Sequence, residues 1–283
     1  MKKSITTTGI GEQFGDRRAI ELIAQAGFDG VDYSCGMVGW DWYKDDIYVN
    51  DHPFTDDKKR ISYAKELKQI ALDNGVVFNQ IHSPAPAKPP VEDWIVKAVE
   101  FCAEMGCEYM IVHPYTADFD YNVRLISKFL HSAKEFNVKL SIENIWHSFE
   151  NGLARGPIGC DEKSLYEIVN YFNSPNVVAC LDVGHAVMKG LETSPEKIIF
   201  ALKDKIKNLH IHDNDLMKDL HQIPFEGSID YAPIMSALKQ VGYDGFLTLE
   251  SIKKDIKDKP ESDTALFLKN SYESALKLEK MFK

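Results

Sequence analysis

Ionisable side chains recur at the ends of short apolar runs in this sequence. Each run has the length and composition of a buried strand, and each ends in an imidazole or a carboxylate. The six residues at these ends are His82, His113, Glu143, Asp182, His212 and Glu250. Imidazoles and carboxylates bind divalent metal ions and transfer protons near neutral pH. The recurrence therefore predicts one polar site assembled from several strands.

Alternation along the runs predicts that these polar ends point toward one interior. Leu140 and Ile142 alternate with Glu143, and the runs that end at His212 and Glu250 alternate in the same manner. Residues two apart share a face of a strand, so the apolar side chains face outward and the polar ones inward. Carboxylates gathered there would repel by about 4 kcal/mol per pair at 4 Å with an effective dielectric constant near 20.

A bound divalent cation is the simplest way to offset this repulsion. The predicted ligands are Glu143, Asp182, His212 and Glu250. Carboxylates with imidazole suit Mn²⁺, Mg²⁺, Co²⁺ or Zn²⁺, whereas a closed structural zinc site would use thiolates. His210 lies two residues before His212 on the same face, and we interpret it as a residue that holds a ligand carboxylate in place.

Further residues near these ends keep several roles open. Four histidines are compatible with binding a second metal, contacting substrate or transferring a proton: His82, His113, His185 and His221. The aromatic segment 34–56, which contains Trp40, is too long for a simple connection. It either covers a substrate or packs around its own small aromatic core. Trp146, just beyond Glu143, either faces substrate or lies in a solvated loop.

The elements that position these residues alternate along the chain. Strands are expected at 4–8, 30–33, 76–82, 109–113, 138–143, 177–182, 206–212 and 246–250. Helices are expected at 17–26, 57–73, 91–105, 122–136, 163–172, 195–202, 231–240 and from about 261. Eight such units predict an α/β fold, a (β/α)8 TIM barrel. A doubly wound sheet is the alternative, because periodicity does not reveal closure. No linker divides the chain, so a single domain over residues 1–283 is expected.

Composition narrows the classes of function. The net charge is -10, with 43 acidic and 33 basic residues, so a nucleic-acid or membrane partner is not expected. The five cysteines form no CxxC pair and are interpreted as reduced thiols. The sequence offers neither a secretory h-region nor a long apolar run, so we expect a cytoplasmic protein. A homo-oligomer is compatible with the aromatic segment.

The ordered motifs resemble those of the xylose-isomerase-like TIM barrels, a superfamily that includes endonuclease IV. The likeness is carried by residues 81–84, 112–114, 142–144, 180–185, 209–215, 219–221, 225–230 and 248–250. By this resemblance, Glu143, Asp182, His212 and Glu250 match the single-metal quartet of sugar epimerases and isomerases. Further zinc ligands of endonuclease IV are matched by His82, His113, His185, Asp219 and His221.

Three departures from the nuclease pattern favour a small-molecule enzyme. Tyr115 and Thr116 replace a glycine-led turn, Gly184 stands where the nuclease has cysteine, and residues 145–147 are bulky. We therefore expect a metal-dependent isomerase or epimerase of a small sugar or polyol, phosphorylated or not, with Glu143 and Glu250 transferring protons. A dehydratase or lyase acting on a related polyol and an endonuclease IV-like zinc phosphodiesterase are the alternatives. Trp40 and Trp146 are the expected substrate-binding aromatics.

Overall fold

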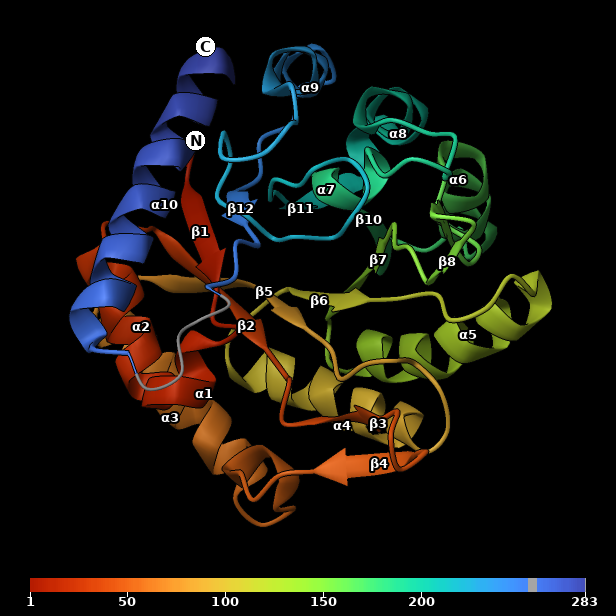
Figure 1. The fold of residues 1–283 in the computed structure, drawn as a ribbon. Coiled ribbons are helices and arrows are strands. Elements are labelled where there is room, and N and C mark those ends of the chain that lie inside the picture. The colour runs from red at the N-terminus through yellow and green to blue at the C-terminus, as the bar shows by residue number, and fades with distance from the viewer. Residues whose placement is uncertain (254–258, 283) are drawn as a thin grey trace.

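Eight parallel strands form the central sheet of the molecule (Figure 1). The computed structural model describes residues 1–253 and 259–282. The strands are β1 (Lys3–Thr6), β2 (Gly30–Ser34), β5 (Val77–His82), β6 (Tyr109–Val112), β7 (Lys139–Glu143), β10 (Val177–Asp182), β11 (Ile206–His210) and β12 (Leu247–Leu249). Their order in the sheet is β11-β10-β7-β6-β5-β2-β1-β12.

The two end strands of this order meet and close the sheet. Ile211 pairs with Leu249 in a parallel bridge. The Ile211 N–H donates to the Thr248 carbonyl at 2.9 Å, and the Glu250 N–H donates to the Ile211 carbonyl at 3.0 Å. Closure confirms the (β/α)8 barrel and excludes the doubly wound sheet.

Helices surround the barrel, except for the short α7, which lies inside the ring next to β10 and β11 (Figure 1). They are α1 (Ile10–Phe14), α2 (Asp16–Gln25), α3 (Arg60–Asp73), α4 (Val91–Glu104), α5 (Phe119–Glu135), α6 (Glu162–Tyr171), α7 (Val183–Ala186), α8 (Pro195–Leu202), α9 (Tyr231–Gln240) and α10 (Glu261–Phe282), with 3-10 turns η1 (Pro53–Thr55) and η2 (Lys203–Lys205). Side-chain caps begin several of them: Asp118, Asp161 and Ser194 accept backbone N–H groups of α5, α6 and α8.

The hydrophobic core lies between the barrel and this ring of helices. β10 is buried along its whole length, and α2 buries Ile20 and Ile23 on the face that meets the sheet. Full burial of such a side chain contributes roughly 1.5–3 kcal/mol. The last helix also closes the ring, because the Met1 ammonium pairs with Glu279 of α10 at 2.7 Å.

Two hairpins that were not expected from the sequence lie outside the barrel. β3 (Val38–Asp41) pairs with β4 (Asp46–Val49), and β8 (Ser148–Glu150) pairs with β9 (Leu153–Arg155), both antiparallel. In segment 34–56, Phe54 packs against Phe101 in the main hydrophobic core, whereas Trp42 is 64% exposed. A substrate-covering role of this segment stays a prediction.

Several strands end earlier than the sequence suggested. His113, His212 and Glu250 follow β6, β11 and β12 instead of closing them. Their backbones still leave the sheet at its carboxyl edge, so their side chains reach the same mouth. Within the described residues, no helix is long and apolar enough to cross a bilayer.

Candidate metal centre

Three of the predicted carboxylates come together at the carboxyl end of the barrel. Oxygens of Glu143, Asp182 and Glu250 lie within 4.8 Å of one another, together with a ring nitrogen of His210. All four residues are buried. The expected convergence of the strand ends therefore holds for these groups, and like charges gathered at this distance need a compensating cation or protons.

Glu143 is the most heavily hydrogen-bonded member of this group. His113 Nε2 donates to its Oε2 at 2.8 Å, and His210 Nδ1 donates to its Oε1 at 2.9 Å. Burial alone would raise the pKa of Glu143, but the charges of His210 and His113 and these hydrogen bonds hold that pKa well below its usual value. Glu143 is therefore a carboxylate at neutral pH.

Glu250 has the opposite electrostatic environment. Burial raises the pKa of Glu250 to about 8, although His210 and His221 counteract the shift. Without a cation, Glu250 is thus mostly protonated at neutral pH while Glu143 is ionised. Two carboxyl groups whose pKa values are pushed apart are suited to donating and accepting protons in the same reaction.

His210 is held in position by Asp32, a residue that was not predicted from the sequence. Its Nε2 lies 3.1 Å from Asp32 Oδ2 and 2.8 Å from the Gln80 amide. Burial favours a neutral ring, but Glu143 and Glu250 raise the pKa of His210 well above its usual value. Because both nitrogens are engaged, the geometry supports the interpretation of His210 as a holder of Glu143. The one indication of this role in the sequence was that Asp32 is an acidic residue inside a strand expected to be buried.

Asp182 and His212 form the next part of the centre. His212 Nε2 lies 3.2 Å from Asp182 Oδ2, and the Asn144 side chain exchanges two 2.8 Å hydrogen bonds with the Asp182 backbone. Gly184 makes room for this imidazole, since a Cβ at 184 would lie 2.0 Å from His212 Cε1. A cysteine at that position would displace the ring.

A second group lies beside the first. Ligand atoms of His185, His212, Asp219 and His221 lie within 4.8 Å of one another. Asp219 Oδ2 is 3.3 Å from His185 Nε2 and 3.2 Å from His221 Nε2. His212 therefore falls nearer to Asp182 and Asp219 than to the two glutamates. A third group joins His82 and His113 to Glu143, with His82 Nε2 3.7 Å from Glu143 Oε2.

The donor atoms of these groups fit a divalent cation. Among the described residues, five solvent-shielded atoms here have no hydrogen-bond partner: Asp182 Oδ2, both ring nitrogens of His212, Asp219 Oδ1 and Glu250 Oε2. Asp182 Oδ2 and His212 Nε2 of this set lie 3.2 Å apart but do not form a hydrogen bond. Buried polar atoms rarely stay unpaired, so the set points to a missing partner. Carboxylate oxygens and imidazole nitrogens are ligands for Mn²⁺, Zn²⁺ and Co²⁺. Cys180 lies near His210, but burial raises its pKa, so it is a poor thiolate ligand.

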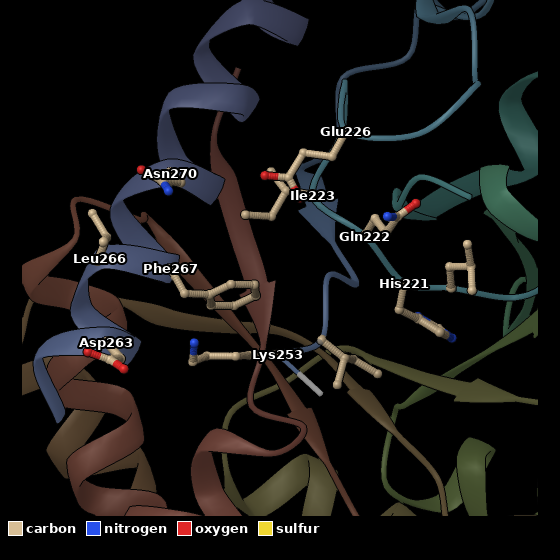
Figure 2. Close-up of a pocket in the computed structure, with 11 residues that line it drawn as sticks. His221, Gln222, Ile223, Glu226, Lys253, Asp263, Leu266, Phe267 and Asn270 are labelled. Atoms are coloured by element: carbon tan, nitrogen blue, oxygen red, sulfur yellow. The ribbon is translucent and has the colours of Figure 1, made fainter. Parts of the chain in front are cut away.

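Three cavities open around these groups. The central pocket, of about 230 Å³, is lined by His82, His221 and Glu250 among others. An aromatic-lined space of about 390 Å³ contains the predicted substrate-binding residues Trp40 and Trp146. A third cavity, of about 500 Å³, lies between α10 and the segment after β11 (Figure 2).

The sequence offers Arg155, Lys189, Lys253 and Lys254 as candidates for binding a substrate phosphate, and those that the structure describes do not converge on the centre. Arg155 pairs with Glu150 at 3.0 Å. Figure 2 shows Lys253 running toward α10, away from His221. Lys189 lines none of the three cavities, and Lys254 lies outside the described residues.

Comparison with known proteins assigns the family. The family model for the xylose isomerase-like TIM barrel matches residues 20–270, so the chain belongs to this family. An uncharacterised protein of Methanocaldococcus jannaschii is 28% identical over 228 residues, 74% of each chain. Inosose dehydratase of Geobacillus kaustophilus is 21% identical, covering 77% of this chain and 87% of its own. A probable endonuclease 4 of Persephonella marina is 18% identical, covering 62% of this chain and 68% of its own.

Solved structures agree on the fold. A D-tagatose 3-epimerase-like protein superposes with a TM-score of 0.70 at 23% identity, covering 98% of this chain and 99% of that one. The IOLI protein, whose crystal structure has a bound zinc atom, superposes with a TM-score of 0.70 at 18% identity. The match covers 100% of this chain and 98% of that one. At these identities the likeness establishes the barrel.

Proposed function

We propose that this protein is a metal-dependent isomerase or epimerase of a small sugar or polyol. The observation that carries the proposal is the convergence of Glu143, Asp182 and Glu250 next to shielded donor atoms that lack partners. The family includes sugar-converting relatives, such as the D-tagatose 3-epimerase-like protein and inosose dehydratase, which supports a sugar or cyclic polyol as the substrate class.

The proposed ligands are Glu143, Asp182, His212 and Glu250, with Mn²⁺, Mg²⁺, Co²⁺ or Zn²⁺ as the ion. A cation bound there would polarise the substrate carbonyl and the neighbouring hydroxyl. This would acidify the C–H of the carbon that bears the hydroxyl, next to the carbonyl. His113 and His210 hold Glu143 as a carboxylate, in position to accept that proton. A proton delivered through Glu250 to the other face of the same carbon would invert the centre.

Proton exchange tests this proposal directly. The metal-loaded protein is incubated with a panel of ketoses and inososes in deuterated water, and products are followed by NMR. We expect deuterium at the carbon next to the carbonyl of at least one sugar, and none with Glu143→Gln. Metal-loaded protein that exchanges no proton of any compound in the panel would remove the basis for the proposal.

A dehydratase is separated by the same experiment. Isomerisation conserves the mass of the product, whereas elimination of a β-hydroxyl loses water. Both begin with the same proton abstraction, so Glu143 would keep its role in either reaction.

A zinc phosphodiesterase is the second candidate function, and the three overlapping ligand groups favour it. Three ions could then occupy His82–His113–Glu143, the carboxylate group and His185–Asp219–His221. Against it stand Gly184, whose lack of a side chain makes room for His212, and the bulky Trp146. Elemental analysis separates the two candidates: about three tightly held zinc ions per chain favour the phosphodiesterase, and one exchangeable ion favours the epimerase.

A further inference from the structure

An aromatic cleft lies beside the central pocket. We define it by six residues on two walls: Trp40, Trp42 and Tyr48 on one, and Tyr115, Trp146 and His147 on the other. Its volume is about 390 Å³. One wall is the β3–β4 hairpin, and the other is built from the segments after β6 and β7. Three of the four tryptophans of the chain line this one cleft.

The aromatic cleft adjoins the proposed reaction site. Tyr48 and Ala85 line both the cleft and the central pocket. His113, which donates to Glu143, also lines the cleft. The shared residues place the cleft next to the proposed reaction site.

Both walls are fixed by contacts within the protein. The Trp146 indole N–H donates to Asp219 Oδ2 at 3.0 Å, which links this wall to the metal centre. On the other wall, Gly39 pairs with Ala85. The Tyr48 hydroxyl donates to the Gly36 carbonyl at 3.1 Å. A Cβ at Gly39 would lie 2.6 Å from the Tyr48 oxygen, so the glycine permits this ring position. A preorganised wall lowers the entropic cost of binding.

We propose that the aromatic cleft binds a second sugar unit, joined to the unit that reacts at the metal centre. The inference rests on the proposed function and names its substrate class: a disaccharide or glycoside instead of a free monosaccharide. The central pocket, at about 230 Å³, lies below the roughly 300–1,000 Å³ of pockets that enclose a drug-sized ligand. It suits one small sugar, and the cleft provides room for a second.

The chemistry of the walls favours a sugar over a purely apolar group. Aromatic faces carry a partial negative charge, which attracts the positively polarised C–H groups on the flat side of a sugar ring. The same property holds a cation here: Lys88 Nζ lies 3.4 Å from the centre of the Trp40 ring and 5.3 Å from that of Trp42.

Intrinsic fluorescence reports on this cleft. Trp94 of α4 is the one tryptophan outside the cleft lining, so the Trp94→Phe protein confines the signal to the cleft. The metal-loaded Trp94→Phe protein is titrated with fructose and with the glucosyl-fructose disaccharides turanose and leucrose. We expect at least one disaccharide to bind about tenfold more tightly than fructose and to change the fluorescence.

Two variants of the same hairpin provide the controls. Trp42 is 64% exposed, so Trp42→Ala leaves the core intact and should reduce disaccharide affinity to that of fructose. Tyr43→Ala, beside it and fully exposed but outside the cleft lining, should leave both affinities unchanged. Equal affinity for fructose and both disaccharides overturns the inference, as does tighter binding of 4-nitrophenyl glucoside, which carries an aromatic ring in place of the second sugar.

The failure of the inference is distinguishable from the failure of the proposed function. If deuterium exchange into ketoses occurs while the disaccharides show no advantage, the second-sugar site alone is wrong. If no exchange occurs but a disaccharide still binds tenfold more tightly in a Trp42-dependent manner, the cleft is confirmed as a sugar site and the epimerase assignment is wrong.

Discussion

The two ends of the barrel interior are both polar, but they balance their polar groups in different ways. Toward the amino ends of the strands lie neutral side chains: Ser4, Asn79, Gln80, Asn208 and Thr248. Each makes at least one hydrogen bond to another member, such as Ser4 Oγ to Thr248 Oγ1 at 2.9 Å. At the carboxyl ends the side chains are ionisable, and neither ring nitrogen of His212 has a hydrogen-bond partner among the described residues.

This difference separates a structural interior from a binding centre. A buried neutral group needs one good hydrogen bond, which a neighbouring amide or hydroxyl supplies. A buried carboxylate needs a positive charge as well. Asp182 and Glu250 each have an oxygen without a partner. Asn79 and Asn208 at the amino end also leave an amide oxygen without a partner, but these groups are neutral. The amino end is therefore expected to be independent of an ion, and the carboxyl end to depend on one.

The largest expected effect comes from removing a ligand. His212→Ala should lower metal affinity and the rate of proton exchange by about 100-fold or more, because it deletes one of the four proposed ligands. Metal content after dialysis, measured by elemental analysis, checks the first effect. His131→Ala, an exposed histidine on α5, is the matched control and should leave both unchanged. Full metal content in the His212 variant would contradict the proposed ligand set.

A smaller effect on metal affinity is expected from Asp32, which contacts His210 and is not itself a proposed ligand. Asp32→Asn keeps the shape of the residue but removes the charge that faces His210 at 3.1 Å. Loss of such a supporting contact typically weakens metal binding by about 10- to 100-fold. Isothermal titration with Mn²⁺ measures it, and Asp45→Asn on the exposed hairpin turn is the control. Unchanged affinity would mean that Asp32 does not position Glu143 through His210.

Asp32 also marks the boundary of what the sequence could predict. The convergence of Glu143, Asp182 and Glu250 followed from strand alternation, because it depends only on the two-residue period and barrel closure. Asp32 stands inside a strand, so its position gave no sign of a shared site. A buried acidic residue nevertheless requires a partner, and that requirement was the available signal.

The grouping of His212 with Asp219 could not be read from local pattern. It depends on how the segment 213–230 folds back over the barrel mouth, where Asp213 pairs with Gln222 through two backbone hydrogen bonds. The β3–β4 hairpin was missed for a related reason. Its register pairs Trp40 with Ile47 across a turn whose residues lack the glycine typical of short hairpins.

Metal binding should depend on pH through Glu250. Its pKa of about 8 in the metal-free fold means that a ligating Glu250 must release a proton below that pH. Apparent affinity should therefore rise by up to about tenfold per pH unit between pH 6 and 8 and then level off. Titration calorimetry in buffers of different ionisation enthalpy measures the released proton, and Glu250→Gln should release none.

Glu250 also determines how the free energy of unfolding changes with pH. Its folded pKa lies above the unfolded value, so its contribution to the unfolding free energy is present at low pH and is lost as pH rises through about 8. Saturating metal should reduce this loss.

Burial opposes the shift of His221, but Glu250 and Asp219 raise its pKa to about 9. Proton release that continues up to pH 9 would thus indicate an ion bound by His221 and Asp219.

The smallest effect is expected at the amino end of the barrel. Ser4→Ala removes one hydrogen bond to Thr248, which keeps a second partner in Asn79 at 3.0 Å. The unfolding free energy should fall by about 1 kcal/mol, the usual net value of a neutral hydrogen bond, in a urea titration. Metal content and proton exchange should stay at wild-type levels, because no member of the neutral network needs an ion. A loss of bound metal in this variant would show that the two ends of the barrel are coupled, through Gln80 and its contact with His210.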